Sequence, residues 1–326
     1  MPVDQAIGLA TDIAIFSLLA LSAYLVLLVG RISFGQQAYF GVGAYASGLA
    51  STLAQWPLSL ALLLGMVVGA VLSVMLAFPT LRLSGLNYAV ATLALAEMMR
   101  IGLLSWHFTH EIDGQPVGPQ GADGFRDIRW LLENDVSPGF FLLICAGTLL
   151  GVLLALAWLR PRRLGLALRQ VGHDEALAAS QGLPVLRLQL FAVGLAGALA
   201  ALGGGLYAHR ATYIEPALFD SMLGVHAVGY ALIGGLGTAL GPLIGVAFDI
   251  GLLEATKVFA GWRIIVFGGL VALFLRYRPR GLLDEHTSPE TFLDRHRSSQ
   301  LRALALLGKD PHYPGPQAHR LAIGGC

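Results

Sequence analysis

Hydrophobic positions along this chain come in long apolar runs that are separated by short polar breaks. Each run has about 20 residues, the length that an α-helix needs to cross the hydrocarbon core of a bilayer. The pattern predicts an all-α, polytopic transmembrane helical bundle of about nine spans, within a range of about eight to ten. The predicted segments are residues 7–30, 34–55, 58–78, 85–106, 139–159, 190–208, 221–236, 239–257 and 262–275.

Some of these segments are irregular. The second and fourth are the least hydrophobic, and we expect them to be broken or re-entrant. The seventh and eighth meet around Gly234, Gly235 and Gly237, so they also admit an interpretation as one long span with a kink. The external loop at residues 107–138 is rich in Gly and Pro, which predicts a series of tight turns rather than regular elements.

Composition supports the membrane interpretation. Charged residues make up 13% of the 326 positions, whereas soluble domains carry roughly 25%. No Lys or Arg precedes the first apolar run, which argues against a cleaved signal peptide. The two cysteines form neither a disulfide framework nor a metal site, and we expect no metal, no cofactor and no nucleic acid partner.

The charge distribution predicts the orientation. The longest polar interruption, residues 160–189, is basic, and the positive-inside rule places it in the cytoplasm. With nine spans, the N-terminus is then periplasmic and the C-terminus cytoplasmic, and few basic residues remain outside. We therefore expect a transmembrane permease domain at residues 1–283 and a flexible cytoplasmic tail at residues 284–326. The arginines of the interruption are Arg160, Arg162, Arg163, Arg169 and Arg187.

Within the interruption, residues 173–181 read as a short helix. Asp174 is suited to cap its first turn, Gly182 to take the left-handed position after it, and Pro184 to prevent continuation. A short helix between two spans on the cytoplasmic side projects from the membrane, and we expect another polypeptide to bind it.

No catalytic set stands out in the sequence. There is no GxxxxGK[ST] phosphate loop, no HExxH, and no Ser, His and Asp grouping that the topology would bring together. We therefore expect a protein that is not an enzyme and does not hydrolyse ATP alone.

Ionisable residues inside spans have two interpretations because burying them in lipid is costly. Glu97 either pairs with Arg100 near a helix end or faces the bundle interior and shapes a translocation path. Asp249 and Glu254 are similar, and Lys257 is placed to neutralise Glu254.

A polar run in the second segment also has two interpretations. It either forms interhelical hydrogen bonds in a tightly packed pair, or it marks a broken helix whose freed backbone groups bind a polar or zwitterionic solute. An amino acid brings one carboxylate and one ammonium group, which half-helix ends and buried Glu or Gln could match. The residues are Ser33, Gln36, Gln37 and Tyr39, with Asn87 and Tyr88 in the fourth segment open to the same two interpretations.

Several stretches together resemble the permease subunits of branched-chain amino-acid ABC importers, the LivM type of the hydrophobic amino acid uptake family. They are RISFGQQAYFGVGAY, LRLSGLNYAVATLALAEMMR, residues 165–207 around GHDEALAASQGLP, IGGLGTALGPLIGVAF and FLRYRPRGL. The resemblance covers roughly residues 10–283. Two departures are visible: Gln36 and Gln37 stand where the family usually has His and Ala, and Ala176 rather than Glu175 falls at the Glu position of the general importer motif.

The resemblance implies an inner-membrane subunit that pairs with a homologous permease as a heterodimer. It also implies two ATPase subunits in the cytoplasm and a periplasmic solute-binding protein. The short helix would then be the coupling helix that docks on the ATPase, and branched-chain or related amino acids would be the substrates. The residues expected to carry the coupling are His173, Asp174, Glu175, Ala178, Ala179 and Gly182.

Other functions stay open at this point. Relatives in the family also import urea and short amides. A self-sufficient secondary transporter would use Glu97, Asp249 or Glu254 as its ion site, and a passive channel for a small neutral solute would need none of them.

Overall fold

The computed structural model describes residues 3–112, 115–254, 268–269, 271–273 and 276. The chain divides into two units, Met1–Asp284 and Glu285–Cys326, and every described residue belongs to the first. Most of the ninth predicted span, at 262–275, and the whole predicted tail, at 284–326, therefore lie outside the described residues.

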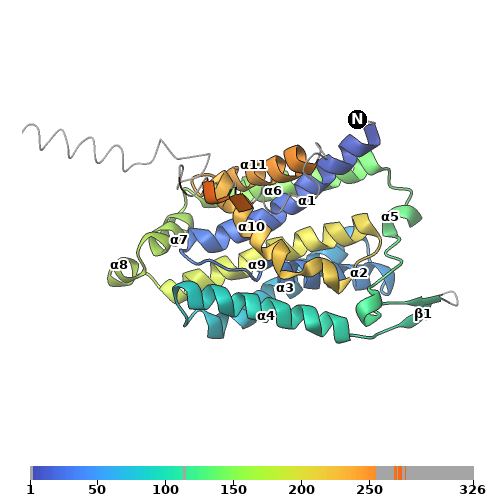
Figure 1. Cartoon of the computed structure of the whole chain (residues 1–326), viewed down its shortest axis with the longest axis horizontal. Helices are drawn as coiled ribbons and strands as arrows, with labels where there is room; N and C mark the ends of the chain where they lie inside the picture. Colours follow the sequence, from blue (N-terminus) through green and yellow to red (C-terminus); the bar gives the residue numbers. More distant parts are fainter. Residues whose placement is uncertain (1–2, 113–114, 255–267, 270, 274–275, 277–326) are drawn as a thin grey trace, which may run out of the picture. The chain divides into compact units, whose positions relative to one another are not determined.

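A helix occupies each of the first eight predicted segments (Figure 1). Among the described residues, five helices are long and apolar enough to cross a membrane: α1, α3, α4, α6 and α9. The prediction of an apolar helical membrane protein is thereby confirmed. The helices of these segments are α1 (Val3–Leu28), α2 (Gln36–Thr52), α3 (Leu58–Thr80), α4 (Gly85–Ser105), α6 (Pro138–Leu159), α9 (Val185–Ala211), α10 (Ser221–Gly234) and α11 (Gly241–Val246), which continues into the π-helical η3 (Ala247–Glu254).

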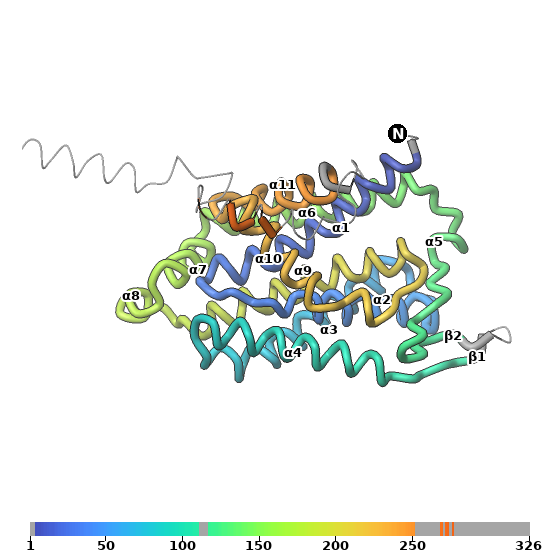
Figure 2. Tube along the Cα trace, viewed as in Figure 1, coloured from blue at the N-terminus to red at the C-terminus, as the bar shows by residue number. Residues whose placement is uncertain are grey.

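Helix α9 is the centre of the packing, with α1, α2 and α3 against it (Figure 2). Glycine lets these helices touch backbone to backbone. A Cβ on Gly204 of α9 would lie only 1.8 Å from the Phe40 carbonyl oxygen of α2, and a Cβ on Gly43 of α2 would lie 2.3 Å from the Ala201 Cα of α9. Inside a bilayer the hydrophobic effect does not join helices, so close packing of this kind stabilises their association.

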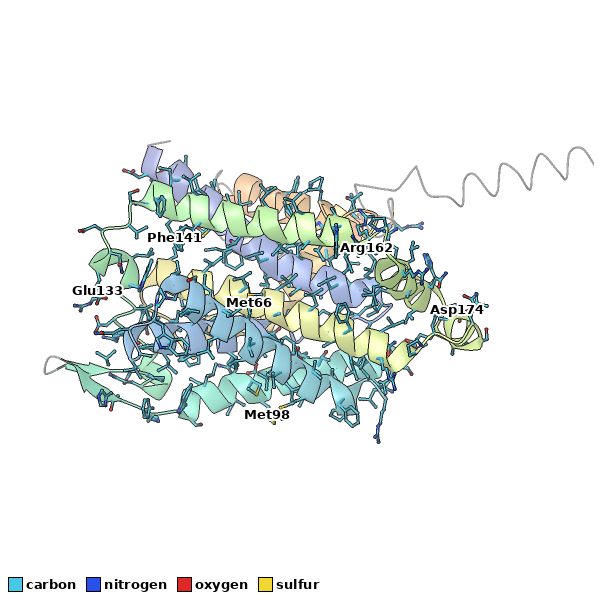
Figure 3. All side chains as sticks on the ribbon, turned by 180° about the vertical axis from the view of Figure 1, so that it is seen from behind. Met66, Met98, Glu133, Phe141, Arg162 and Asp174 are labelled. Atoms are coloured by element: carbon cyan, nitrogen blue, oxygen red, sulfur yellow. The ribbon has the colours of Figure 1, made fainter. Side chains whose placement is uncertain are left out.

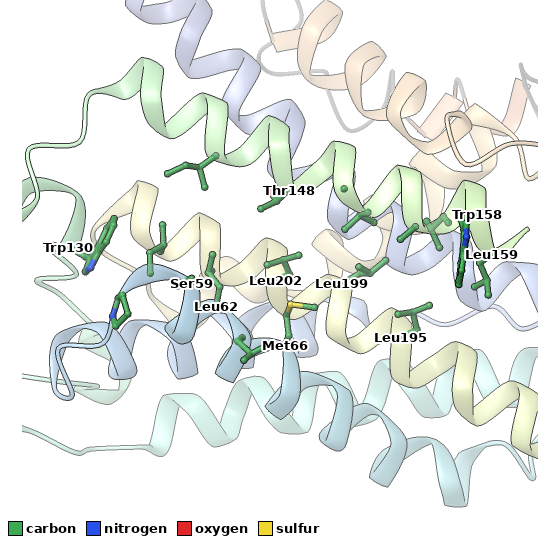
Figure 4. Close-up of a pocket in the computed structure, with 18 residues that line it drawn as sticks. Ser59, Leu62, Met66, Trp130, Thr148, Trp158, Leu159, Leu195, Leu199 and Leu202 are labelled. Carbon is green, nitrogen blue, oxygen red and sulfur yellow. The ribbon is translucent and has the colours of Figure 1, made fainter.

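The outer helices keep apolar side chains on the surface. On α6, Leu143, Leu150 and Leu154 are all exposed. A groove of about 880 Å³ runs between α3 and α6 with α9 as its floor, and side chains such as Met66, Trp158 and many leucines line it (Figure 4). Apolar surface of this extent is expected of helices that face hydrocarbon.

The second predicted segment is not a broken helix. Helix α1 ends at Leu28, Gly30 makes the turn with φ +75°, and the irregular segment 31–35 leads back along α1 to α2 (Figure 2). Helix α2 is then continuous, as is α4, so the expectation of breaks within these helices is wrong. The interruption lies before α2, because the backbone of residues 31–35 is not helical.

Helices α10 and α11 form an antiparallel pair rather than one kinked span. A Cβ on Gly234 would meet the Gly241 carbonyl oxygen at 1.8 Å, and one on Gly245 would meet the Tyr230 carbonyl oxygen at 2.2 Å. The reversal between them begins at Gly235, whose φ of +95° suits glycine.

The predicted external loop contains regular elements, contrary to expectation. Strands β1 (His110–Ile112) and β2 (Gln115–Val117) pair antiparallel, and η1 (Gly121–Asp123) and α5 (Trp130–Glu133) follow. Phe125 exchanges backbone hydrogen bonds with Ile214 beyond α9, and both side chains are fully buried. The all-α prediction therefore misses a small hairpin, in which β1 and β2 pair with each other, and it misses the distant pairing of Phe125 with Ile214 that holds the rest of the loop in place.

Candidate functional site

The basic interruption folds into two helices that lie at one end of the bundle, opposite the β1–β2 hairpin (Figures 1 and 3). Helix α7 (Arg163–His173) precedes α8 (Glu175–Ser180). The predicted short helix at 173–181 is present as α8, which begins two residues later and ends one residue earlier than predicted, because extended backbone at Asp174 (φ −157°, ψ 108°) separates it from His173 at the end of α7. The predicted caps are confirmed: the Asp174 carboxylate accepts the Leu177 N–H at 3.0 Å, and Gly182 has φ +80°.

One face of α8 packs against the bundle, and the other face is exposed. Ala178 is 2% exposed and packs in an apolar cluster with α7, the start of α9 and the turn after α1. His173, Ala179 and Gly182 are exposed, and Leu177 is 57% exposed. An exposed leucine on a short, capped helix is a suitable contact for a groove on another protein. The other members of the cluster are Val29, Leu168, Val171, Leu188 and Ala192.

A second polar feature lies inside the bundle, where the irregular segment 31–35 meets α2. The Phe34 N–H donates to Thr92 Oγ1 of α4 at 3.2 Å, and the Gly35 N–H donates to Ser33 Oγ at 3.2 Å. No side chain caps the first turn of α2. Thr92 lies seven residues after the start of α4, and α4 starts at the end of the bundle that carries α8. At about 1.5 Å per residue, α2 therefore begins about 10 Å inside the bundle from that end.

Two glutamines open α2, and both are buried. Gln36 is 0% exposed and its Oε1 accepts the Ser22 hydroxyl of α1 at 3.1 Å, but its Nε2 has no hydrogen-bond partner among the described residues. Gln37 is 1% exposed, and within the same part of the chain neither atom of its amide is paired. Unpaired amide atoms in a protein interior cost free energy of folding, so we expect a ligand or water to bind these groups.

The N-terminus of α10 reaches the same place. A Cβ on Gly224, in its first turn, would lie 2.0 Å from Gln37 Oε1 and 2.8 Å from the Phe34 carbonyl oxygen. Two helix N-termini, with their positive dipole ends, therefore converge beside the glutamines, although Asp220 caps that of α10 by accepting the Leu223 N–H. This convergence was not predicted; the only signals for it were the short seventh segment and the glycines within it.

The other predicted path residues are not all drawn into this cluster. Tyr39 and Tyr88 are buried, whereas Asn87 is exposed on the first turn of α4. Glu97 forms the local ion pair with Arg100 that was one of its two interpretations. The structure thus groups Ser33, Gln36 and Gln37.

Two further acidic residues within the helices, one buried and one half-buried, have structural partners. Asp249, on the π-helical η3, is fully buried and accepts the Tyr230 hydroxyl at 2.7 Å. Asp12 of α1 pairs with Arg210 of α9 at 2.8 Å. The Glu254 side chain and Lys257 lie outside the described residues. Within the described ranges, no group of three or more His, Cys, Asp or Glu side chains is placed to hold a metal ion.

Comparison with known proteins finds one matching family and several relatives. A model of the family described as "Branched-chain amino acid transport system / permease component" matches residues 5–275. The chain is 28% identical to the high-affinity branched-chain amino acid transport system permease protein LivM of Salmonella typhimurium, over 85% of this chain and 70% of that protein. No solved structure matches.

Two further relatives carry names for other solutes. The ribose import permease protein RbsC of Haemophilus influenzae is 25% identical, over 77% of this chain and 76% of its own. The autoinducer 2 import system permease protein LsrC of an Enterobacter species is 30% identical, over 83% and 78%.

Proposed function

The chain belongs to the branched-chain amino acid transport system permease component family, and from this premise we propose that it carries branched-chain or related amino acids across the inner membrane as the permease subunit of an ATP-binding-cassette importer. A homologous permease would complete a heterodimer, two ATPase subunits would hydrolyse ATP, and a periplasmic binding protein would deliver the solute. The observation that carries the proposal is the projecting pair α7 and α8, which gives partner chains a rigid contact.

In the proposed orientation, α7 and α8 lie in the cytoplasm with the five arginines of residues 160–189. The described helices together with a ninth span at 262–275 then give about nine crossings, a periplasmic N-terminus and a cytoplasmic tail. Helix α8 docks on the ATPase through its exposed face, and closure of the ATPase pair moves it. The coupling residues are His173, Asp174, Glu175, Ala178, Ala179 and Gly182.

The translocation path is proposed to pass the cluster at the start of α2. The uncapped first turn and the dipole of α2 suit the carboxylate of an amino acid, and the unpaired amide atoms of Gln36 and Gln37 suit its polar groups. Ser33, Tyr39, Asn87, Tyr88 and Glu97 complete the proposed path.

A sugar-like solute is the second candidate substrate, because relatives are named as ribose and autoinducer 2 permeases. Amide groups also bind hydroxyls, so the glutamines do not decide between the two. Titration of the cognate binding protein with leucine, urea and ribose distinguishes them, since only the transported class binds.

Two experiments test the proposal. Reconstituted with its partner subunits, the chain is expected to accumulate solute only when ATP is supplied; full uptake by the chain alone, driven by an ion gradient, would instead make it a secondary transporter. In the second, Ala178→Pro removes the hydrogen bond from the Ala178 N–H to the Asp174 carbonyl (3.0 Å) and should abolish uptake without preventing insertion.

The matched control is Ala176→Pro. Ala176 lies in the first turn of α8, where proline is tolerated because the N–H lacks a helical acceptor. Uptake by Ala178→Pro equal to that of Ala176→Pro would count against coupling through α8.

A further inference from the structure

Arg31 stands between the projecting helices and the polar cluster. It follows the turn that ends α1 and is only 8% exposed. Its Nη1 donates to the Leu83 carbonyl oxygen at 2.6 Å, and its Nη2 lies 2.9 Å from Glu175 Oε1 of α8. The guanidinium also lies 5.6 Å from the centre of the Tyr88 ring. One side chain thus joins α8, the α3–α4 turn, α4 and the irregular segment 31–35.

The carboxylate on the other side of this ion pair is held as well. Gln189 of α9 is buried, and its Nε2 donates to Glu175 Oε1 at 2.7 Å. The Glu175 side chain is 43% exposed, so solvent screens the pair on that side, but the Arg31 side chain is only 9% exposed, and loss of the carboxylate beside a buried guanidinium destabilises the fold. Arg31 therefore has to follow any displacement of Glu175, or lose its counter-charge in a low-dielectric site.

Backbone contact supports the same connection. A Cβ on Gly172 of α7 would lie 2.1 Å from the Leu28 carbonyl oxygen, and one on Gly30 would lie 3.0 Å from the Gly172 carbonyl oxygen. The end of α7 and the turn after α1 are thus in direct contact. Close-packed interiors transmit displacement because they hold few voids.

From Arg31 the chain reaches both glutamines within six residues. Ser33 and Gly35 are buried, and the Phe34 N–H is bonded to Thr92 of α4. A shift of Arg31 therefore changes the position of segment 31–35 and of the first turn of α2, where the unpaired amides of Gln36 and Gln37 lie.

We propose that Arg31 is a positioning residue that transmits the movement of α8 to the polar start of α2, through its ion pair with Glu175. The inference rests on the proposed function, since it supplies the route from the ATPase contact to the translocation path.

The test uses the intact transporter with its partner subunits, and measures heat stability and the number of ATP molecules hydrolysed per solute moved. Glu175→Gln leaves a buried charge unpaired and should lower both stability and uptake. The double variant Arg31→Gln/Glu175→Gln removes both charges, which is often near neutral for folding. We expect this double variant to regain most of the stability, while the number of ATP molecules that it hydrolyses per solute moved stays above the wild-type number.

The control is Asp12→Asn, which breaks the Arg210–Asp12 pair between α1 and α9. It should leave the ATP-to-solute ratio unchanged. A wild-type ratio in the double variant would overturn the role of Arg31 and leave the proposed function standing. ATP-independent uptake by the wild-type complex would overturn both proposals.

Discussion

The contact between α2 and α9 at Gly204 allows a quantitative prediction. A Cβ there would lie 1.8 Å from the Phe40 carbonyl oxygen, whereas ordinary contacts begin near 3.4 Å. To relieve this contact in Gly204→Ala, the two backbones have to move about 1.6 Å further apart than in the wild type. Overpacking of this kind costs about 1–3 kcal/mol, against a gain of up to about 1 kcal/mol from the better helix propensity of alanine.

Thermal unfolding of the purified protein in detergent measures this effect. A net loss of about 1–2 kcal/mol corresponds to a Tm lower by roughly 2–3 °C for a domain of this size. Gly151→Ala is the matched control, because nothing lies within 4 Å of a Cβ at that position on α6. It should be as stable as the wild type or slightly more so. If Gly204→Ala unfolds at the same temperature as Gly151→Ala, the backbone contact between α2 and α9 is wrong.

Two further substitutions separate stability from transport. Gln37→Leu removes an amide whose atoms are both unpaired among the described residues, so we expect unchanged or higher Tm but reduced solute uptake; undiminished uptake would exclude Gln37 from the path. Tyr230→Phe removes the hydroxyl that donates to the buried Asp249 carboxylate at 2.7 Å, and should cost about 1–3 kcal/mol of stability; a Tm equal to that of the wild type would contradict the importance of this bond.

The long spans are the part of the fold that the sequence predicts well. Helices α3, α4 and α6 match the predicted segments within about two residues at each end, because their apolar composition alone determines where lipid-compatible backbone begins and ends. Local capping chemistry also predicts correctly, as at Asp174 and Gly182, since it depends on a few adjacent residues.

Features that depend on distant residues were not predicted. Helix α7 was also missed, although its signal is local: Leu164, Leu168 and Val171 recur at helical spacing among its arginines. The contact between Gln37 and Gly224 joins residues from opposite halves of the chain, and the pairing of Phe125 with Ile214 is similarly remote. No local pattern encodes such neighbours, so the polar cluster at the start of α2 becomes visible only in three dimensions.

The Arg31–Glu175 pair also constrains the order of biosynthesis. The two residues are 144 positions apart, so at about 5–20 residues per second the guanidinium leaves the ribosome about 7–29 s before its carboxylate. During that interval an unpaired arginine cannot settle in the hydrocarbon and has to extend toward the aqueous interface. Arg31 thus has its partners Leu83 and Tyr88 from the first half of the chain, and synthesis of the second half adds the carboxylate of Glu175.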